Sequence, residues 1–104
     1  MEYEIRQIHL SVEKLGLPDI NYGEENTDVI VEMTDGNLYA ASFYSYGNLD
    51  KVIARHRASG EFLDGKYFWV EGMVFVLNCE MNTIAEVVRY LIDEGDFDRI
   101  FKLL

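Results

Sequence analysis

An alternating run followed by a tight turn constrains the fold of this chain more than any other feature. Residues 28–34 alternate, so that Val29, Val31 and Met33 share one face, which is typical of a half-buried β-strand. The next pair, Asp35-Gly36, is a strong two-residue turn signal, because both central positions of such a turn require a positive φ. The sequence therefore predicts a β-hairpin whose second strand runs from residue 37 to about residue 46.

A two-residue loop also predicts the register of this hairpin. It places Met33 opposite Leu38 and Val31 opposite Ala40. These two pairs are expected to form one buried face of the sheet, because directly opposed side chains lie on the same side.

A further strand is expected over residues 3–13, with a fault in its pattern. The apolar side chains occupy odd-numbered positions up to Ile5 and even-numbered positions from Ile8 to Val12. This reversal of phase near residues 6–7 indicates a β-bulge or a bend. Residues 15–27 hold the chain's one proline and several turn formers, and are expected to form a loop.

A helix is expected after the hairpin, because the apolar residues change to helical spacing. Residues 48–59 place apolar side chains and His56 on one face, with Asn48 as the cap and Gly60 as a left-handed ending. Residues 66–70 and 73–77 then predict two strands joined at Glu71-Gly72, with both faces apolar.

The most regular helix is expected over residues 83–94. Thr83 and Glu86 match a capping box, and Gly95 can end the helix. Residues 96–104 repeat apolar side chains at helical spacing, so the tail is expected to pack on the core. The order β-β-β-α-β-β-α-α predicts an α+β fold in one domain, residues 1–104. It would have an antiparallel sheet of about five strands, with two to three helices packed mainly on one face.

The charge of the chain is strongly acidic. Nine basic and 19 acidic residues give a formal net charge of −10. This charge disfavours nucleic acid and acidic membrane surfaces as partners and favours proteins with basic surfaces. The one cysteine, Cys79, rules out an internal disulfide and a metal site built on several thiolates. No leader or membrane span is recognisable, so a cytoplasmic location is expected, with no metal or other cofactor.

Two residues are candidates for chemistry. His56 could act as a general acid or base, but no Asp or Ser stands at helical spacing to orient it, so a boundary role in the helix is favoured. Cys79 follows an apolar strand and has Glu80 beside it, which favours a buried structural role over a nucleophilic one.

Charge segregation is the feature that most favours a binding role, and the alternative is that the acidic loop and helix ends are simply solvated. No lysine or arginine occurs from residue 15 to residue 50. The predicted binding residues in this acidic stretch are Asp19, Glu24, Glu25, Asp28 and Glu32. A second acidic cluster, residues 93–98, falls at a helix end that is already negative, where carboxylates cost stability. The aromatic run at residues 67–69 also predicts a possible homodimer interface, if helices cover only one face of the sheet.

From about residue 28 onward the chain resembles a family of small uncharacterised bacterial proteins. The resemblance rests on Asp35-Gly36, on residues 59–61 followed by 65–69, and on Glu94-Gly95-Asp96-Phe97. In size and acidity, though not in motif, the chain is also similar to immunity proteins that neutralise toxins. The sequence is thus compatible with two functions. The first is a non-enzymatic, immunity-type or regulatory module for a basic partner. The second is a small enzyme or ligand binder with a pocket between sheet and helices that uses His56 or Cys79.

Overall fold

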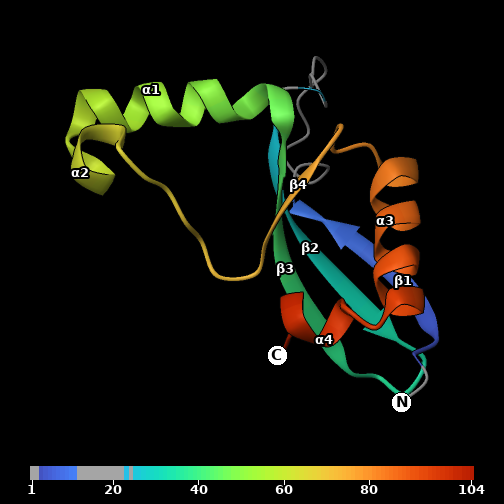
Figure 1. Ribbon diagram of the computed structural model, residues 1–104. Helices are drawn as coiled ribbons and strands as arrows, with labels where there is room; N and C mark the ends of the chain where they lie inside the picture. Colours follow the sequence, from blue (N-terminus) through green and yellow to red (C-terminus); the bar gives the residue numbers. More distant parts are fainter. Residues whose placement is uncertain (1–2, 12–22, 24) are drawn as a thin grey trace.

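The computed structural model describes residues 3–11, 23 and 25–104 (Figure 1). Five strands form one sheet. Four of them follow the order β1-β2-β3-β4, and β5 lies on the same side of β3 as β4, where it pairs with the first residues of β3 while β4 pairs with the last. The strands are β1 (Ile5–Leu10), β2 (Asn26–Met33), β3 (Leu38–Ser45), β4 (Met73–Val76) and β5 (Lys102–Leu103). The helices are η3 (Tyr46–Asn48), α1 (Leu49–Ser59), α2 (Glu61–Gly65), α3 (Met81–Glu94) and α4 (Phe97–Ile100). The predicted α+β fold with a five-stranded sheet is confirmed.

The fourth and fifth strands differ from the prediction. Residues 66–70 are not a strand, so the hairpin expected at Glu71-Gly72 is wrong. Phe68 instead packs its ring against Tyr44 and His56, at centroid distances of 5.4 and 5.2 Å. The chain then enters the sheet at Gly72, and β4 pairs with β3 in parallel, while the other strand pairs are antiparallel. The C-terminal residues supply the fifth strand.

The β2–β3 hairpin is present, but its loop has three residues. The Met33 amide donates to the Asn37 carbonyl at 2.9 Å, and the Gly36 amide to the Met33 carbonyl at 3.0 Å. Gly36 has a φ of +89°, the left-handed conformation that follows a type I turn in such loops. The extra loop residue, Thr34, shifts the register by one, so Glu32 faces Leu38 and Val31 faces Tyr39.

This shift changes which residues of β3 are buried. Ala41 and Phe43 point into the core, whereas Leu38 is exposed and Ala40 only half-buried. The predicted buried pairs with Leu38 and Ala40 are therefore wrong, because a one-residue slip sends every side chain of a strand to the opposite face.

The fault in β1 is a β-bulge at the predicted place. Ile5 pairs with Met33 and Gln7 with Glu32, so Arg6 is the extra residue. The bulge lets Ile8 and Leu10 reach the core beyond it. Val12 and most of the predicted 15–27 loop lie outside the described residues.

The helices α3 and α4 cover one face of the sheet (Figure 1). Helix α3 begins at Met81, and no side-chain cap bond forms there, so the capping box at Thr83 is wrong. Its end is as expected. Gly95, with a φ of +79°, donates to the Ile92 carbonyl and Asp96 to that of Leu91, which is a Schellman ending.

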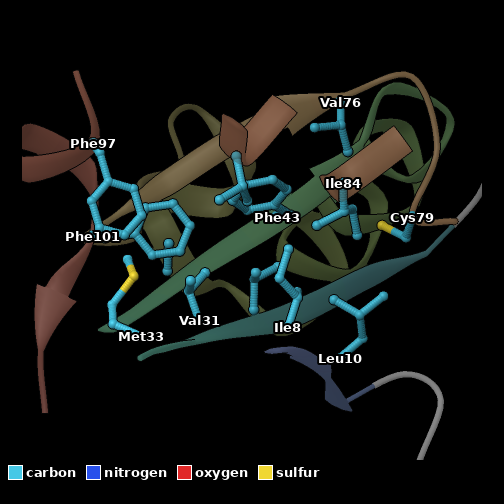
Figure 2. Packing of buried hydrophobic residues seen from close by; sticks show 13 residues of the cluster. Ile8, Leu10, Val31, Met33, Phe43, Val76, Cys79, Ile84, Phe97 and Phe101 are labelled. Carbon is cyan, nitrogen blue, oxygen red and sulfur yellow. The ribbon is translucent and has the colours of Figure 1, made fainter. Parts of the chain in front are cut away.

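The core lies between this helical layer and the sheet (Figure 2). Val29, Val31 and Phe43 of the sheet and Ile84 and Val88 of α3 are all completely buried. The C-terminal segment closes the layer, where the rings of Phe97 and Phe101 stack at a centroid distance of 4.4 Å. The prediction that the tail packs on the core is confirmed.

Helices α1 and α2 form a projecting arm, defined here as residues 46–69. The arm leaves the end of β3 and extends away from the sheet (Figure 1). The radius of gyration is accordingly 14.6 Å, against about 13 Å for a compact domain of this length. Gly60 ends α1 with a φ of +83°, as predicted. In α2, Phe62, Leu63 and Asp64 adopt the left-handed conformation, which carries residue 65 back against α1.

Candidate functional site

A large cavity lies at the hairpin end of the sheet. It has a volume of about 720 Å³. Its lining comes from the start of the chain, the β2–β3 turn, the start of β3 and the C-terminal strand, and consists of Tyr3, Glu4, Met33, Thr34, Asp35, Asn37, Tyr39 and Leu103. We call it the hairpin-end cavity. It is a place where segments far apart in the sequence meet.

An aromatic cluster supports one wall of the hairpin-end cavity. The rings of Tyr3 and Tyr39 meet edge to face at 5.6 Å, and both contact Phe97 of α4, at 4.9 and 5.4 Å. The Tyr3 hydroxyl donates to the Asp98 carboxylate, and this bond, helped by burial, raises the pKa of Tyr3. These contacts tie the first residues of the chain to α4 and keep the wall in place.

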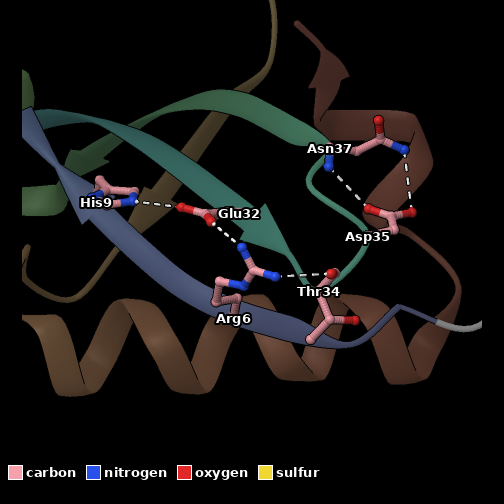
Figure 3. A network of polar contacts seen from close by, with 6 residues as sticks. All are labelled: Arg6, His9, Glu32, Thr34, Asp35 and Asn37. Carbon is pink, nitrogen blue, oxygen red and sulfur yellow. Dashed lines mark hydrogen bonds and ion pairs between the residues drawn. The ribbon is translucent and has the colours of Figure 1, made fainter.

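Two carboxylates lie in the same lining. Asp35 accepts hydrogen bonds from the Asn37 amide at 2.9 Å and the Asn37 side chain at 3.2 Å (Figure 3). Glu4 accepts one from the Thr34 hydroxyl at 3.3 Å. The described lining contains no lysine, arginine or histidine. The guanidinium nearest along the chain, Arg6, makes its hydrogen bonds with Glu32 and the Thr34 carbonyl.

The second acidic cluster lies at this same end of the molecule, where α3 ends and α4 begins (Figure 1). Asp93 and Glu94 are exposed in the last turn of α3, and Asp98 receives the Tyr3 hydrogen bond. Asp96 has Arg99 at 3.9 Å, a distance too long for a strong hydrogen bond. The hairpin turn and the helix ends bring several carboxylates to this end of the molecule, where Arg6 and Arg99 also lie.

The predicted binding residues lie elsewhere. Asp28 and Glu32 are on the face of β2 that points away from α3, while Glu25 comes just before the strand. Asp19 and Glu24 lie outside the described residues. The structure thus brings Asp28 and Glu32 to one face, as alternation required, but places both away from the hairpin-end cavity.

Glu32 already lies beside the guanidinium of Arg6 and the imidazole of His9. Arg6 donates to it at 3.1 Å, and the Nε2 atom of His9 lies 3.4 Å away (Figure 3). The contact with His9, and then that with Arg6, lowers the pKa of Glu32. Part of its charge is therefore compensated within the sheet.

Glu25 and Asp28 also lie near cations. Glu25 lines a shallow cavity of about 340 Å³ together with Lys51 and Arg55 of α1. Asp28 and Arg55 both act on Tyr44: burial and Asp28 raise the pKa of Tyr44, and Arg55 lowers it. The cations that lie near the described part of the acidic stretch therefore offset some of the negative charge that the sequence shows there.

His56 lies in a third cavity, of about 330 Å³, between the sheet and the arm. Arg55, Glu61 and Tyr44 are among the other lining residues. The imidazole packs between the rings of Phe62 and Phe68, at 4.5 and 5.2 Å. Its Nδ1 atom is buried and has no hydrogen-bond partner among the described residues.

Cys79 is buried between β4 and α3, with 0 % of its surface exposed. Its thiol donates to the Glu25 carbonyl at 3.3 Å. Burial raises the pKa of Cys79 to about 11, so the sulfur stays protonated at neutral pH and is a poor nucleophile.

Sequence reasoning did not identify Tyr3, Glu4 and Tyr39 as site residues. No local pattern marks them, since the site forms only when the bulged strand, the hairpin and α4 come together. Asp35 was recognised as a turn residue and as the end of the acidic stretch, but not as part of a cavity lining.

No group of three His, Cys, Asp or Glu side chains in the described part of the chain is arranged to hold a metal ion. Within the same residues, no helix is long and apolar enough to cross a membrane. Comparison with known proteins finds no matching family model, curated protein or solved structure.

Proposed function

We propose that this chain is a non-enzymatic protein-binding module, of the immunity or regulatory type, that engages a basic protein partner. The observation that carries the proposal is the hairpin-end cavity. Two carboxylates and two tyrosine rings line it, without a cationic side chain in the described lining. The single cysteine favours a cytoplasmic location for this activity.

The lining of the hairpin-end cavity suits a lysine or arginine side chain from a partner. Glu4 and Asp35 can accept charge-assisted hydrogen bonds, which are stronger than neutral ones. The faces of Tyr3 and Tyr39 can attract the same cation, with a contribution of about 0.5–2 kcal/mol per ring depending on desolvation. The carboxylates at the ends of α3 and α4 would steer a basic partner toward this end and raise its association rate.

The test uses an arginine-rich peptide as a probe, titrated by fluorescence anisotropy at low and high salt. The double variant Glu4→Gln, Asp35→Asn removes both carboxylates and keeps a residue that tolerates the turn. We expect it to weaken peptide binding about tenfold, or ~1.4 kcal/mol, at low salt.

The matched control is Asp50→Asn, Glu86→Gln, which changes the net charge equally at exposed positions of α1 and α3. It should weaken binding much less. An equal loss in the two double variants would show that the peptide responds only to net charge and would reject the hairpin-end cavity as the site.

The acidic stretch remains a second contact surface in this proposal. Asp28 is exposed, and Glu25 is half-buried beside it in sequence. With Glu32, they would form a negative surface on the face opposite α3, and Asp19 and Glu24 belong to the same acidic stretch of the sequence. Glu25→Lys and Asp28→Lys should each slow association with a native partner at low salt, with less effect at high salt.

A specific observation also favours a second function, that of a ligand binder. The unpartnered Nδ1 atom of His56 lies beside a cavity that Arg55 and Glu61 line, and a small polar ligand there could satisfy it. Screening small anions by the backbone amide chemical shifts of the residues that line this cavity would test this function. Binding that His56→Phe abolishes, with the fold intact, would favour it over the protein-binding module.

A further inference from the structure

The two outer edges of the sheet differ in chemistry. At the β1 edge, a bulge and the charged side chain of Arg6 interrupt the strand, and both features discourage pairing with another strand. At the β4 edge, the segment from Gly72 to Cys79 has no charged residue and no proline. Among the described residues no strand pairs with the outer side of β4. Only the β4 edge therefore has the chemistry of a pairing surface.

The register with β3 determines which backbone groups of β4 face outward. The Ser42 amide donates to the Gly72 carbonyl at 2.9 Å, and Ser42 is level with Met73. In a parallel ladder of this phase, residues 74 and 76 bond to β3, while the amides and carbonyls of Met73 and Phe75 point away from it. These outward groups can bond a further strand.

Apolar side chains surround the same edge. Phe75 is 37 %, Leu77 71 % and Trp69 62 % exposed. A set of large exposed apolar residues beside an unpaired strand is typical of an interface, because contact with a partner removes both from water.

The charge distribution identifies a second copy of the chain as a suitable occupant. Residues 46–79 contain four basic residues, Lys51, Arg55, Arg57 and Lys66, and four acidic ones, Asp50, Glu61, Asp64 and Glu71. Their net charge is zero, so the whole of the −10 lies on the other parts of the chain. A like-charged copy can therefore approach the arm and β4 with the least repulsion.

We propose that two copies of this chain pair through their β4 strands, antiparallel and about a twofold axis at Val74. This register places Met73 of each copy opposite Phe75 of the other, so all the outward amides and carbonyls of both residues are bonded. Phe75 and Met73 then pack across the axis on the face opposite α3. The two sheets become one continuous sheet, and the hairpin-end cavity of each copy stays open, because it lies at the far end of β3.

The first test is the mass in solution, measured by sedimentation equilibrium from low micromolar to near-millimolar concentration. The wild-type chain should reach twice the 12.1 kDa chain mass. Phe75→Pro removes an outward amide and leaves the bonds to β3 in place, so it should remain a monomer across the series. Leu63→Lys, at an exposed position of the arm tip, is the control and should dimerise like the wild type.

The second test is hydrogen exchange in the wild-type protein, which does not depend on the folding of Phe75→Pro. Amide hydrogen exchange in the wild-type dimer should protect Met73 and Phe75 as well as Val74 and Val76. A monomer at every concentration would overturn the proposal. A dimer that exchanges Met73 and Phe75 as fast as open loops, or that Leu63→Lys disrupts and Phe75→Pro does not, would overturn it too.

Discussion

The Cys79 thiol donates a hydrogen bond to the Glu25 carbonyl across 3.3 Å, which links the segment before α3 to the start of β2. The two residues are 54 positions apart in the chain. The contact closes the end of the core nearest the arm, opposite to the end closed by Phe97 and Phe101. Cys79 thus has a structural task that explains its complete burial.

Burial of Cys79 predicts both low reactivity and an alkaline transition. Iodoacetamide should modify the native thiol slowly, at a rate that rises with denaturant as the chain unfolds. Because folding raises the pKa of the thiol from 9.0 to about 11, its contribution to stability is full below pH 9 and is lost as the pH rises toward 11. Urea titrations from pH 8 to pH 11 should show a steeper loss of stability for the wild type than for Cys79→Ala. Parallel curves for the two proteins would contradict this assignment.

Helix α3 offers a matched pair of substitutions on its two faces. Ile84 is completely buried against the sheet, so Ile84→Ala should lower the free energy of unfolding by about 2–5 kcal/mol. Tyr90, on the same helix, is 63 % exposed, and Tyr90→Ala should change it by less than about 0.5 kcal/mol. Similar losses for both variants in urea titrations would mean that α3 does not pack through the face described.

The contacts of Glu32 predict an acid transition. Since folding lowers the pKa of this carboxyl, its contribution to stability is present above about pH 4.5 and is lost as the pH falls through the lowered value. Glu32→Gln should therefore be less stable than the wild type at neutral pH, and the difference should shrink on acidification. A difference that stays constant from pH 7 to pH 3 would show that Arg6 and His9 do not stabilise the carboxylate.

His56 provides a test of the second function through stability alone. His56→Phe keeps the packing between Phe62 and Phe68 and removes the unpartnered Nδ1 atom. A buried polar atom without a partner costs about 1–3 kcal/mol, so the variant should be equally stable or more stable by about 1 kcal/mol in thermal and urea unfolding. A clear loss of stability would show that the imidazole already has a partner within the protein, and would remove the observation that favours the ligand-binding function.

Alanine substitutions at two glycines distinguish the cost of backbone conformation from the cost of steric crowding. Both Gly36 and Gly65 have positive φ, so alanine at either position costs about 1 kcal/mol in backbone conformation. A Cβ on Gly36 would meet nothing, whereas a Cβ on Gly65 would lie 2.9 Å from Arg57 Cγ and 3.1 Å from the Ile53 carbonyl. Gly65→Ala should therefore be the more destabilising of the two. Equal losses would mean that α2 does not pack closely on α1.

Local patterns predicted the elements, and longer-range contacts decided how they pair. The bulge at Arg6 and the endings at Gly60 and Gly95 follow from alternation and from the freedom of glycine, which are properties of neighbouring residues. The hairpin register did not follow, because Asp35-Gly36 fits both a two-residue loop and a three-residue loop with a left-handed glycine. Sequence alone gives no measure of the free-energy difference between these loops.

The parallel β3–β4 pair and the hairpin-end cavity were beyond local reasoning. Residues 66–70 have the composition of a strand, but Phe68 packs on His56 of α1, a contact that requires the arm to turn back at Gly65. The cavity depends on the meeting of Tyr3, the hairpin turn and α4, which are remote in sequence. The acidity that predicted a basic partner was visible from composition, whereas the meeting of Glu4 and Asp35 in one cavity lining is a product of topology.

The parallel pairing of β3 with β4 has a consequence for how the chain folds. Strands β1, β2 and β3 are antiparallel neighbours, and β2 and β3 need only a short turn, whereas β4 joins β3 only after residues 46–72 close a loop. Loop closure is an entropic cost that grows slowly, by about 0.6 kcal/mol for each doubling of length. Residues inserted at the exposed tip near Leu63 should therefore slow refolding, since closing a longer loop takes more time, and should leave the native stability nearly unchanged. The length of the arm therefore affects how fast the sheet assembles, and this length can vary more freely than the residues at the two ends of the arm.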